Sequence, residues 1–547
     1  MRLIRFGKSS PPGFLSFIRY MSNVIPQENE EYTATPQYPP ILDLSYKETV
    51  KRKAEKEYNE IKYVKTVEEK QIKLNMPRYY GFKNFMFYEP EILCESLPLT
   101  QHVTRTHIIT NKDLPEYYEN LNVENVEDIS KDVQEVILME VERIKKSHKL
   151  KNLKLTEVEV ENILSKSIVN GINRVLMSHL SHTHEHIKNI EVDVEPRLEA
   201  SWVVGGINPD ERLKKIRKGH TFFKQFENDP IDRYFGYIGS PMLALRASRP
   251  LPFIMSSSEA ENPDLEVPFY KYDPRSVGTR IEHRHLANVP GFWPGDANTF
   301  GTLSYIKTGH FLKRDTYFIE ESEKKEARHV QAILSSYAWL YSQANYLGFT
   351  TFNDITYPIV NQTVMTNGKD FQFYIYQLNT ILLNNYHISN NPKRNICWAS
   401  QQLKLYEEIK DDKLIGFNED VVKLLVKLYI NEPQERLGVN LRPYLSDEEQ
   451  IAADYSDDDK RKWLEKEYKH IVSNRPRHKE MDEVYQWEKI YKIDFNTRPM
   501  DKKMRFFELF EKPWKRRLND RLPEYICRAR RPHLPRHKGR YAKDYWP

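Results

Sequence analysis

Residues 357–380 read YPIVNQTVMTNGKDFQFYIYQLNT, and they carry the clearest structural signal in the chain. The runs 357–365 and 370–380 are rich in β-branched and aromatic residues, which favour strands. Between them lies Thr366-Asn367-Gly368-Lys369, and Asn-Gly is typical of the type I′ turn that joins two strands. The stretch therefore predicts a β-hairpin closed by a type I′ turn.

Amphipathic helices are predicted on both sides of this hairpin. Apolar residues recur at helical spacing in 133–144 and again after Thr156, where Glu159 completes a capping box. A third helix is expected over about 324–347, and a fourth begins after the N-cap Asn418 and stops before Pro433. Residues 200–315, with many Pro, Gly and aromatic residues, are interpreted as irregular. The predicted fold class is therefore α+β, a mixed globular body with a β-hairpin and several amphipathic helices.

The composition excludes several functional classes. The 547 residues are 39% hydrophobic, enough for a sizeable core, and no apolar run approaches the roughly 18 residues of a membrane span. Glycine, at 19 residues, is about half as frequent as usual, which disfavours the phosphate-cradling loops of a nucleotide-driven enzyme. Cys94, Cys397 and Cys527 lie far apart, so a disulfide framework and a four-cysteine zinc site are excluded and a reducing compartment fits.

The amino terminus has the composition of a targeting sequence. Residues 1–27 contain four basic residues, several serines and no acid, which is typical of a mitochondrial transit peptide. Such a peptide predicts a mitochondrial matrix location. Residues 28–90 are expected to form a Pro/Tyr-rich extended arm and then a charged helix over 47–73, which ends by Pro77.

Positive charge is concentrated at the carboxyl end. Residues 512–543 hold twelve Lys and Arg against two acids, whereas residues 28–511 have a net charge of −8. Basic side chains neutralise phosphates, and the interleaved Trp and Tyr residues can stack on bases or sugars. The tail therefore predicts an extended RNA-binding strip; the alternative is a solvated tail or one docked on acidic protein. The predicted RNA-binding residues are Lys515, Arg516, Arg517, Arg521, Arg528, Arg530, Arg531, Arg536, Lys538 and Arg540.

Catalysis and metal binding are not predicted by any residue pattern. His179, His182 and His186 would share one face of a helix and could bind zinc, but a helix C-terminus with free carbonyls explains them better. Cys397 is interpreted as a core residue beside a tryptophan, and residues 457–459, all Asp, as a solvated helix start. Walker, GxGxxG, HExxH and GxSxG motifs are absent from the sequence. We therefore expect no cofactor, no metal and no small-molecule substrate.

The segments around the hairpin resemble one protein family. The matching pieces are YPIVNQTVMTNGKDFQFYIYQLNT (357–380), NNPKRNICW (390–398), LYEEI (405–409) and GFNEDVV (416–422). Weaker likenesses are YPPI (38–41), VEEK (67–70) and YAWLYSQANYLGF (337–349). In this order they resemble the mitochondrial ribosomal proteins of the programmed cell death protein 9 family, over about residues 38–435.

This resemblance implies a structural protein of the mitochondrial ribosome, in the large subunit although the family was long assigned to the small one. A protein of that kind is expected to contact neighbouring ribosomal proteins, and the charge of the tail predicts the contact with ribosomal RNA. A paralogue, the large-subunit protein numbered thirty-seven, is the expected partner in a heterodimer, and PGFWPGD (290–296) is similar to a piece shared across that pair. The family has no catalytic residues to carry over. Shorter members end near residues 431–435, so the RNA role of the tail depends on charge alone.

These patterns together predict four regions. They are a transit peptide (1–27), an extended arm and charged helix (28–90), an α+β body (91–435) and a helical and basic carboxyl-terminal extension (436–547). The predicted function is architectural, binding RNA and proteins in the mitochondrial ribosome to support translation. Two further hypotheses are a free mitochondrial RNA-binding or assembly factor and a hydrolase that uses Cys397 or the histidines.

Overall fold

The computed structural model describes residues 42–75, 83–89, 95–110, 113–147, 155–221, 223–283, 287–308, 320–385, 388–411 and 413–472. The chain divides into two compact units, residues 1–54 and 55–547. In the described part of the first unit, helix α2 (Tyr46–Lys62) begins, and its later turns belong to the second unit. The predicted transit peptide, the Pro/Tyr-rich arm and all ten predicted RNA-binding residues lie outside the described residues.

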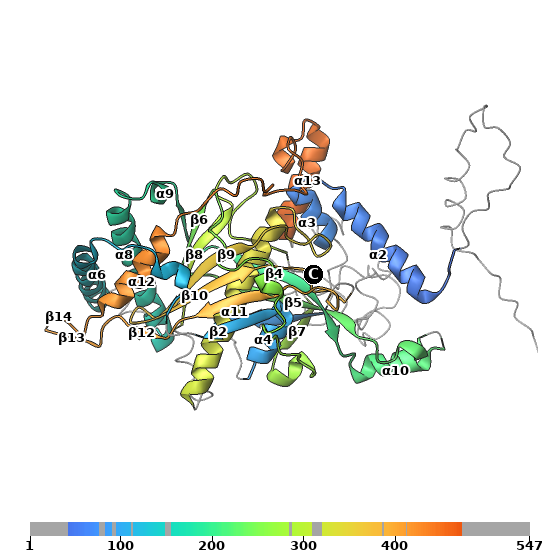
Figure 1. Cartoon of the computed structure of the whole chain (residues 1–547), viewed down its shortest axis with the longest axis horizontal. Coiled ribbons are helices and arrows are strands. Elements are labelled where there is room, and N and C mark those ends of the chain that lie inside the picture. The colour runs from blue at the N-terminus through green and yellow to red at the C-terminus, as the bar shows by residue number, and fades with distance from the viewer. Residues whose placement is uncertain are drawn as a thin grey trace, which may run out of the picture. The chain divides into compact units, whose positions relative to one another are not determined.

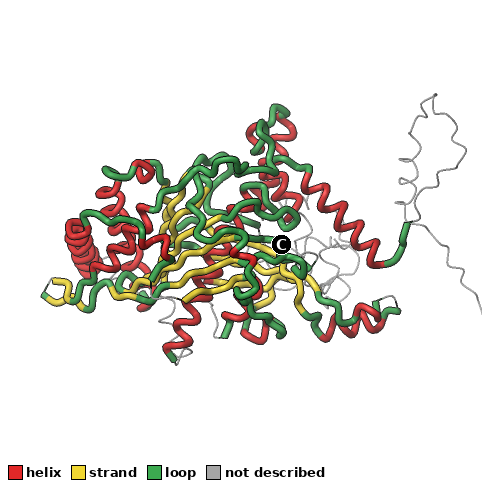
Figure 2. The backbone as a smooth tube through the Cα atoms, viewed as in Figure 1, coloured by secondary structure: helices red, strands yellow, loops and turns green. Residues whose placement is uncertain are grey.

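The second unit is built around a mixed sheet with the strand order β2-β11-β10-β9-β8-β6-β3 and β12 beside β10 (Figure 1, Figure 2). Strands β8 and β9 pair in parallel, as do β11 and β2, and the other pairs are antiparallel. Strands β9 and β10 form the predicted hairpin. The strands are β2 (Thr106–Thr110), β3 (Glu191–Val194), β6 (Leu243–Ala247), β8 (Phe300–Lys307), β9 (Ile359–Thr366), β10 (Asp370–Leu378), β11 (Asn395–Ala399) and β12 (Leu403–Lys404).

The turn of this hairpin differs from the predicted one. Phe371 pairs with Thr366, so four residues lie between the paired ends, and only Gly368 among them has a positive φ, 88°. A type I′ turn needs a positive φ at both central residues, so this prediction is wrong. The Asn367 side-chain oxygen instead accepts the backbone N–H groups of Lys369 (3.0 Å) and Asp370 (2.7 Å). This Asx-type bonding stabilises a longer loop.

A second sheet has the order β4-β5-β1-β7, with β1 and β5 parallel. Its strands are β1 (Lys83–Tyr88), β4 (Leu198–Ile207), β5 (Ile231–Gly239) and β7 (Arg280–His283). Residues 200–315 therefore contain strands of both sheets, and their interpretation as irregular is wrong. Gly205 and Gly206 interrupt the strand pattern where the β4–β5 register shifts. A Cβ on Gly205 would lie 2.1 Å from the Asn385 backbone nitrogen, which is why a glycine stands there.

Helix α11 (Glu321–Tyr346) lies between the two sheets and links the parallel strands β8 and β9 (Figure 1). All residues from His329 to Tyr346 are buried, as expected for a helix with core on every side. Tyr337 packs edge-on against Trp202 of β4, with the ring centroids 5.2 Å apart. Gly348 follows with φ 93°, so the predicted third helix is confirmed.

Helices α6 (Val126–Lys146), α8 (Glu157–Leu180) and α12 (Glu419–Ile430) cover the other face of the large sheet (Figure 1). Alternate residues of β10 face opposite ways. Phe373 and Ile375 belong to the core under these helices, whereas Tyr374 and Tyr376 belong to the core around α11. Because both faces of β10 are buried, its central residues 373–376 (FYIY) are all apolar or aromatic and do not alternate with polar residues.

The predicted helix starts are confirmed. Thr156 Oγ1 accepts the Glu159 N–H at 3.4 Å, and a Glu159 carboxylate oxygen accepts the Thr156 N–H at 2.8 Å. Asn418 Oδ1 accepts the Asp420 N–H at 3.0 Å and so caps α12. The charged stretch over 47–73 is divided between α2 and a second helix, α3 (Val67–Asn75).

The described end of the chain packs against α3. Helix α13 (Asp458–Val472) buries Leu464 in a small cluster with Ile72, and the Glu68 carboxylate accepts the Ala452 N–H at 2.9 Å. Shorter elements are α4 (Leu97–Thr104), α5 (Glu116–Glu119), α9 (Glu185–Lys188), α10 (Glu211–Gly219), η2 (Lys224–Phe226), η3 (Glu259–Glu261), η4 (Pro274–Val277), η6 (Ala452–Asp454), β13 (Glu408–Lys410) and β14 (Lys413–Ile415). The mixture of helices and mixed sheets confirms the α+β class. In the part of the chain that the structure describes, no helix combines the length and apolar character needed to cross a bilayer.

Candidate functional site

Cys397 lies on β11, between β2 and β10 of the large sheet, and is paired with Tyr376 of β10. Its side chain is fully buried in the core around α11. Burial raises the pKa of the Cys397 thiol, which keeps it protonated, whereas a nucleophilic thiol needs a lowered pKa. The interpretation of Cys397 as a core residue is confirmed.

The histidines of 179–186 do not share a helical face, because α8 ends at Leu180. His179 Nε2 lies 2.6 Å from the Asp132 carboxylate, and His186 Nε2 lies 2.9 Å from the Tyr429 carbonyl at the end of α12. His179 and His186 thus have separate structural partners. The carbonyl that His186 meets belongs to α12 and not to the helix that the histidines were expected to end, so that part of the interpretation is wrong. Among the described residues, no group of three or more His, Cys, Asp or Glu is placed to hold a metal ion.

The acidic run 457–459 also has a structural role. Asp457 Oδ1 accepts the Asp459 N–H at 3.0 Å, and Asp458 pairs with Arg461 on the exposed side of α13. Carboxylates suit the positive end of a helix, so the prediction of a solvated helix start is confirmed.

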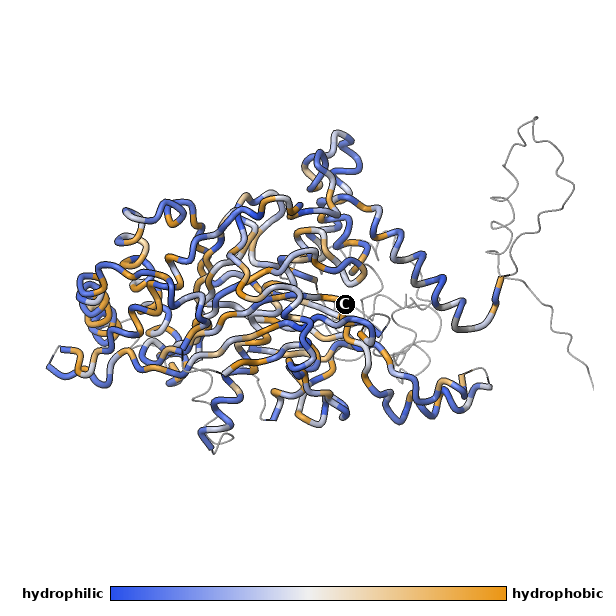
Figure 3. The backbone as a smooth tube through the Cα atoms, viewed as in Figure 1, coloured by the Kyte–Doolittle hydropathy of each residue, from blue (hydrophilic) through white to orange (hydrophobic). Residues whose placement is uncertain are grey.

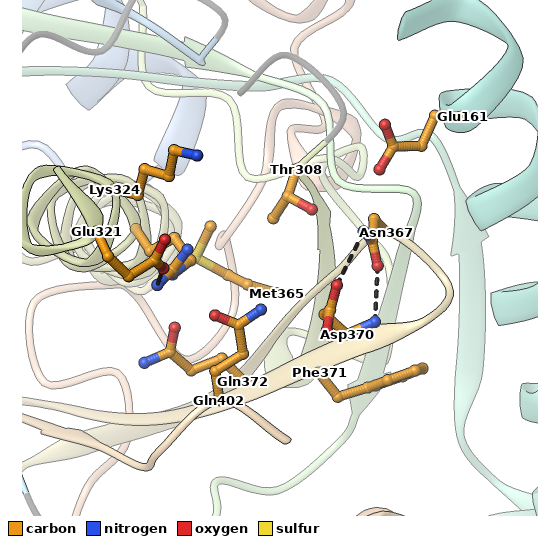
Figure 4. Close-up of a pocket in the computed structure, with 11 residues that line it drawn as sticks. Glu161, Thr308, Glu321, Lys324, Met365, Asn367, Asp370, Phe371, Gln372 and Gln402 are labelled. Carbon is orange, nitrogen blue, oxygen red and sulfur yellow. Dashed lines mark hydrogen bonds and ion pairs between the residues drawn. The ribbon is translucent and has the colours of Figure 1, made fainter. Parts of the chain in front are cut away.

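A polar cavity of about 250 Å³ lies beside the hairpin loop, between α8, the start of α11 and β10 (Figure 4). Asn367 Nδ2 donates to Asp370 (3.3 Å), and Arg328 pairs with Glu321 (3.2 Å). Burial raises the pKa of Glu161, which faces the same space. The lining mixes charges of both signs and brings neither Cys397 nor a histidine to the cavity, so neither proposed hydrolase residue finds a site here. The lining residues are Glu161, Thr308, Glu321, Lys324, Arg328, Met365, Asn367, Asp370, Phe371, Gln372 and Gln402.

The segment PGFWPGD (290–296) forms a loop held over a buried arginine. Arg246 is 2% exposed, and its guanidinium stacks 4.6 Å from the Phe292 ring centroid and pairs with Asp296 at 3.0 Å. The Tyr346 hydroxyl accepts the Gly295 N–H at 3.0 Å. Trp293 is 64% exposed, so its indole faces solvent while the contacts of neighbouring residues hold the loop in place.

A basic helix that the sequence reasoning missed lies in the connection between β4 and β5. Helix α10 reads ERLKKIRKG, with five basic residues and one acid, and none of its residues is buried. Asp210 caps it by accepting the Leu213 N–H at 2.8 Å. In Figure 1 the helix stands at the far end of β4 and β5, and Figure 3 shows it as mostly hydrophilic. A charge count in a short window over 211–219, five basic residues against one acid, would have found it.

Comparisons with known proteins identify the family. The sequence model described as mitochondrial 28S ribosomal protein S30 (PDCD9) matches residues 16–433. Proteins named large ribosomal subunit protein mL37 are similar in part: the rat protein is 29% identical over 172 residues and the mouse protein 28% over 171, in each case 31% of this chain and 38% of the relative. The chicken protein is 28% identical over 133 residues, 21% of this chain and 30% of the relative. The chain thus spans well under half the length of these relatives, whereas the family model covers most of it. On that match, the chain belongs to the mitochondrial 28S ribosomal protein S30 (PDCD9) family.

Proposed function

We propose that this chain is a structural component of the large subunit of the mitochondrial ribosome. The observation that carries the proposal is the family match over residues 16–433. The family description names the 28S, small subunit, whereas the partly similar rat and mouse proteins are named for the large subunit. We favour the large subunit because the rat and mouse proteins that match in sequence are named for it.

In this role the chain binds ribosomal RNA through its basic tail and supports translation by holding neighbours in place. Phosphate contacts fix position without reading base sequence, which suits an architectural protein. The ten residues from Lys515 to Arg540 supply this contact, and the transit peptide 1–27 directs the chain to the mitochondrial matrix. The regions 28–90, 91–435 and 436–547 serve as arm, body and extension.

Protein neighbours complete the proposed setting. The similarity to proteins named mL37 supports a paralogue of that kind as the partner in a heterodimer. Related chains with the same core pattern can present matching surfaces, so a pseudo-symmetric pair is the simplest arrangement. The chain does no catalysis in this role, in keeping with the buried thiol of Cys397 and the separate structural partners of His179 and His186.

Gradient sedimentation of a mitochondrial lysate tests the proposal. We expect the chain to migrate with the large subunit at roughly 0.3 M salt and to crosslink to an mL37 protein, because phosphate contacts alone weaken steeply with salt. Release at that salt would favour a free RNA-binding or assembly factor. A Cys397→Ala variant that assembles normally but loses function would favour the hydrolase.

The tail has its own test. Charge reversal at Arg528, Arg530 and Arg531 should reduce incorporation into the particle. The control reverses three exposed lysines of α13, Lys462, Lys466 and Lys469, and should incorporate as the unaltered chain does. Equal incorporation and equal RNA crosslinking of both variants would contradict the role of the tail.

A further inference from the structure

The cations of α10 divide into two groups by their contacts. Arg217 donates from Nη1 to the backbone carbonyls of Phe226 (2.8 Å) and Asp229 (2.7 Å), so it holds the loop that follows the helix. Lys214 pairs with Glu211 at 3.2 Å and is the less exposed partner. These two cations are occupied within the chain.

Arg212, Lys215 and Lys218 form the second group. They recur at i, i+3 and i+6, and all three are exposed. Within the described residues, none of the three side chains makes a hydrogen bond or an ion pair. At 1.5 Å rise per residue they span about 9 Å of the helix axis, on the side away from Leu213. We call these three residues the α10 cation row.

Helix stability does not explain the α10 cation row. Lys218 lies in the last turn, where a cation complements the helix dipole, but Arg212 lies in the first turn, where the dipole disfavours it. Like charges three residues apart also repel one another. A nine-residue helix is marginal on its own, and α10 buries none of its residues against the body. The α10 cation row therefore destabilises the helix in the isolated chain. A bound polyanion would neutralise the three charges and remove this repulsion.

The surroundings of α10 favour a nucleic-acid partner over a membrane. Its apolar residues are Leu213 and Ile216 only, and a helix that lies in a bilayer surface needs a continuous apolar face. The helix stands at the end of the β4–β5 connection, and residues 28–511 have a net charge of −8. The local excess of positive charge on α10, five basic residues against one acid, favours phosphates although the body as a whole is acidic.

We propose that the α10 cation row is a second RNA-binding site, which contacts the phosphate backbone of ribosomal RNA separately from the tail. The inference rests on the proposed ribosomal function. Three point contacts to phosphates orient the β4–β5 connection on the RNA without reading its bases. The body is then fixed by its own surface, and the tail adds a separate contact.

The test measures how RNA affinity depends on salt. The variant Arg212→Gln/Lys215→Gln/Lys218→Gln is compared with Lys462→Gln/Lys466→Gln/Lys469→Gln, which removes the same charge from exposed lysines of α13. The probe is a transcript of the mitochondrial large-subunit ribosomal RNA, bound to the full chain. Each lost phosphate contact lowers the slope of log K against log salt by about 0.7, so the α10 variant should lose about 2 in slope and roughly 50-fold in affinity near 0.15 M salt. The α13 variant should keep the original slope.

A crosslink within assembled particles provides the second readout. A photoreactive amino acid in place of Ile216, which is 50% exposed on the same helix, should crosslink to RNA. An unchanged slope in the α10 variant, or crosslinks to protein alone, would overturn the inference while leaving the ribosomal role intact. If the unaltered chain fails to migrate with the large subunit, the proposed function itself fails.

Discussion

Replacing Arg246 by methionine should lower the free energy of unfolding by about 3 kcal/mol, the low end of the cost of breaking a buried ion pair, because the Asp193 and Asp296 side chains left unpaired are each 23% exposed. The Arg246 guanidinium contacts Asp193 at 2.5 Å and Asp296 at 3.0 Å, and it also pairs more weakly with the Glu191 carboxylate at 3.3 Å. Burial acts to lower the pKa of Arg246, but the hydrogen bond and charge of Asp193 and the charge of Asp296 raise it overall. Methionine keeps an unbranched chain of similar length, so the loss reports the charges rather than a large cavity.

The assay is urea unfolding of the full chain at pH 7, followed by circular dichroism. The control is Arg275→Gln, which breaks the pair with Asp273 on the surface, where the arginine side chain is 55% exposed. Exposed pairs contribute at most about 1 kcal/mol, so the control should change stability little. Adding Asp193→Asn and Asp296→Asn to the Arg246→Met variant should restore part of the loss, because it removes the stranded charges. If Arg246→Met and Arg275→Gln cost the same, Arg246 does not hold the 290–296 loop in the way described.

Three other predictions follow from buried groups. Burial lowers the pKa of His102 and of His329 to about 4, below the usual value near 6.5, so each contributes stability that is present above pH 6.5 and lost as the pH falls toward 4. From pH 7 to pH 5 each histidine should lower the free energy of unfolding by about 2 kcal/mol. In urea unfolding at these two pH values, the His329→Gln variant should therefore lose about 2 kcal/mol less than the unaltered chain. An equal loss in both proteins would contradict a neutral buried ring. Gly301→Ala should cost about 1–3 kcal/mol, because its Cβ would lie 2.4 Å from an indole carbon of α11, whereas Gly219→Ala, with nothing within 4 Å, should leave the melting temperature unchanged or raise it. With the other two cysteines changed to serine, Cys397 should resist maleimide until the chain unfolds, and rapid labelling of the folded chain would contradict its burial.

Local signals predicted the parts of the fold that depend on local chemistry. The hairpin, the capping box at Thr156 and the cap at Asn418 each involve residues close in sequence, and all three are confirmed. The type I′ turn failed because the Asn367 side chain bonds the backbone of the next residues, an option that competes with the two-residue turn.

The second sheet was missed because its pairings are distant. Strand β1 at residues 83–88 pairs with β5 at 231–239 and with β7 at 280–283, so no short window contains two partners. The family resemblance was stated from residues around the hairpin, and the family match extends from residue 16 to 433. The basic residues of α10 went unnoticed because five are few beside the twelve of the tail, and only the structure shows that none of the residues of this helix is buried.

The body keeps its reactive groups inside and its free cations outside, and this separation has a measurable consequence. Cys397, His329 and Arg246 are buried, and their contacts support the packing around α11 and the 290–296 loop. The α10 cation row supports no packing that the described residues reveal. Variants of the first kind should therefore lower the melting temperature and reduce binding only by reducing the folded fraction, whereas variants of α10 should reduce RNA affinity at an unchanged melting temperature. Measuring both quantities for Arg246→Met and for the triple α10 variant separates the two roles, and a parallel fall of both quantities in the α10 variant would show that this helix is part of the core after all.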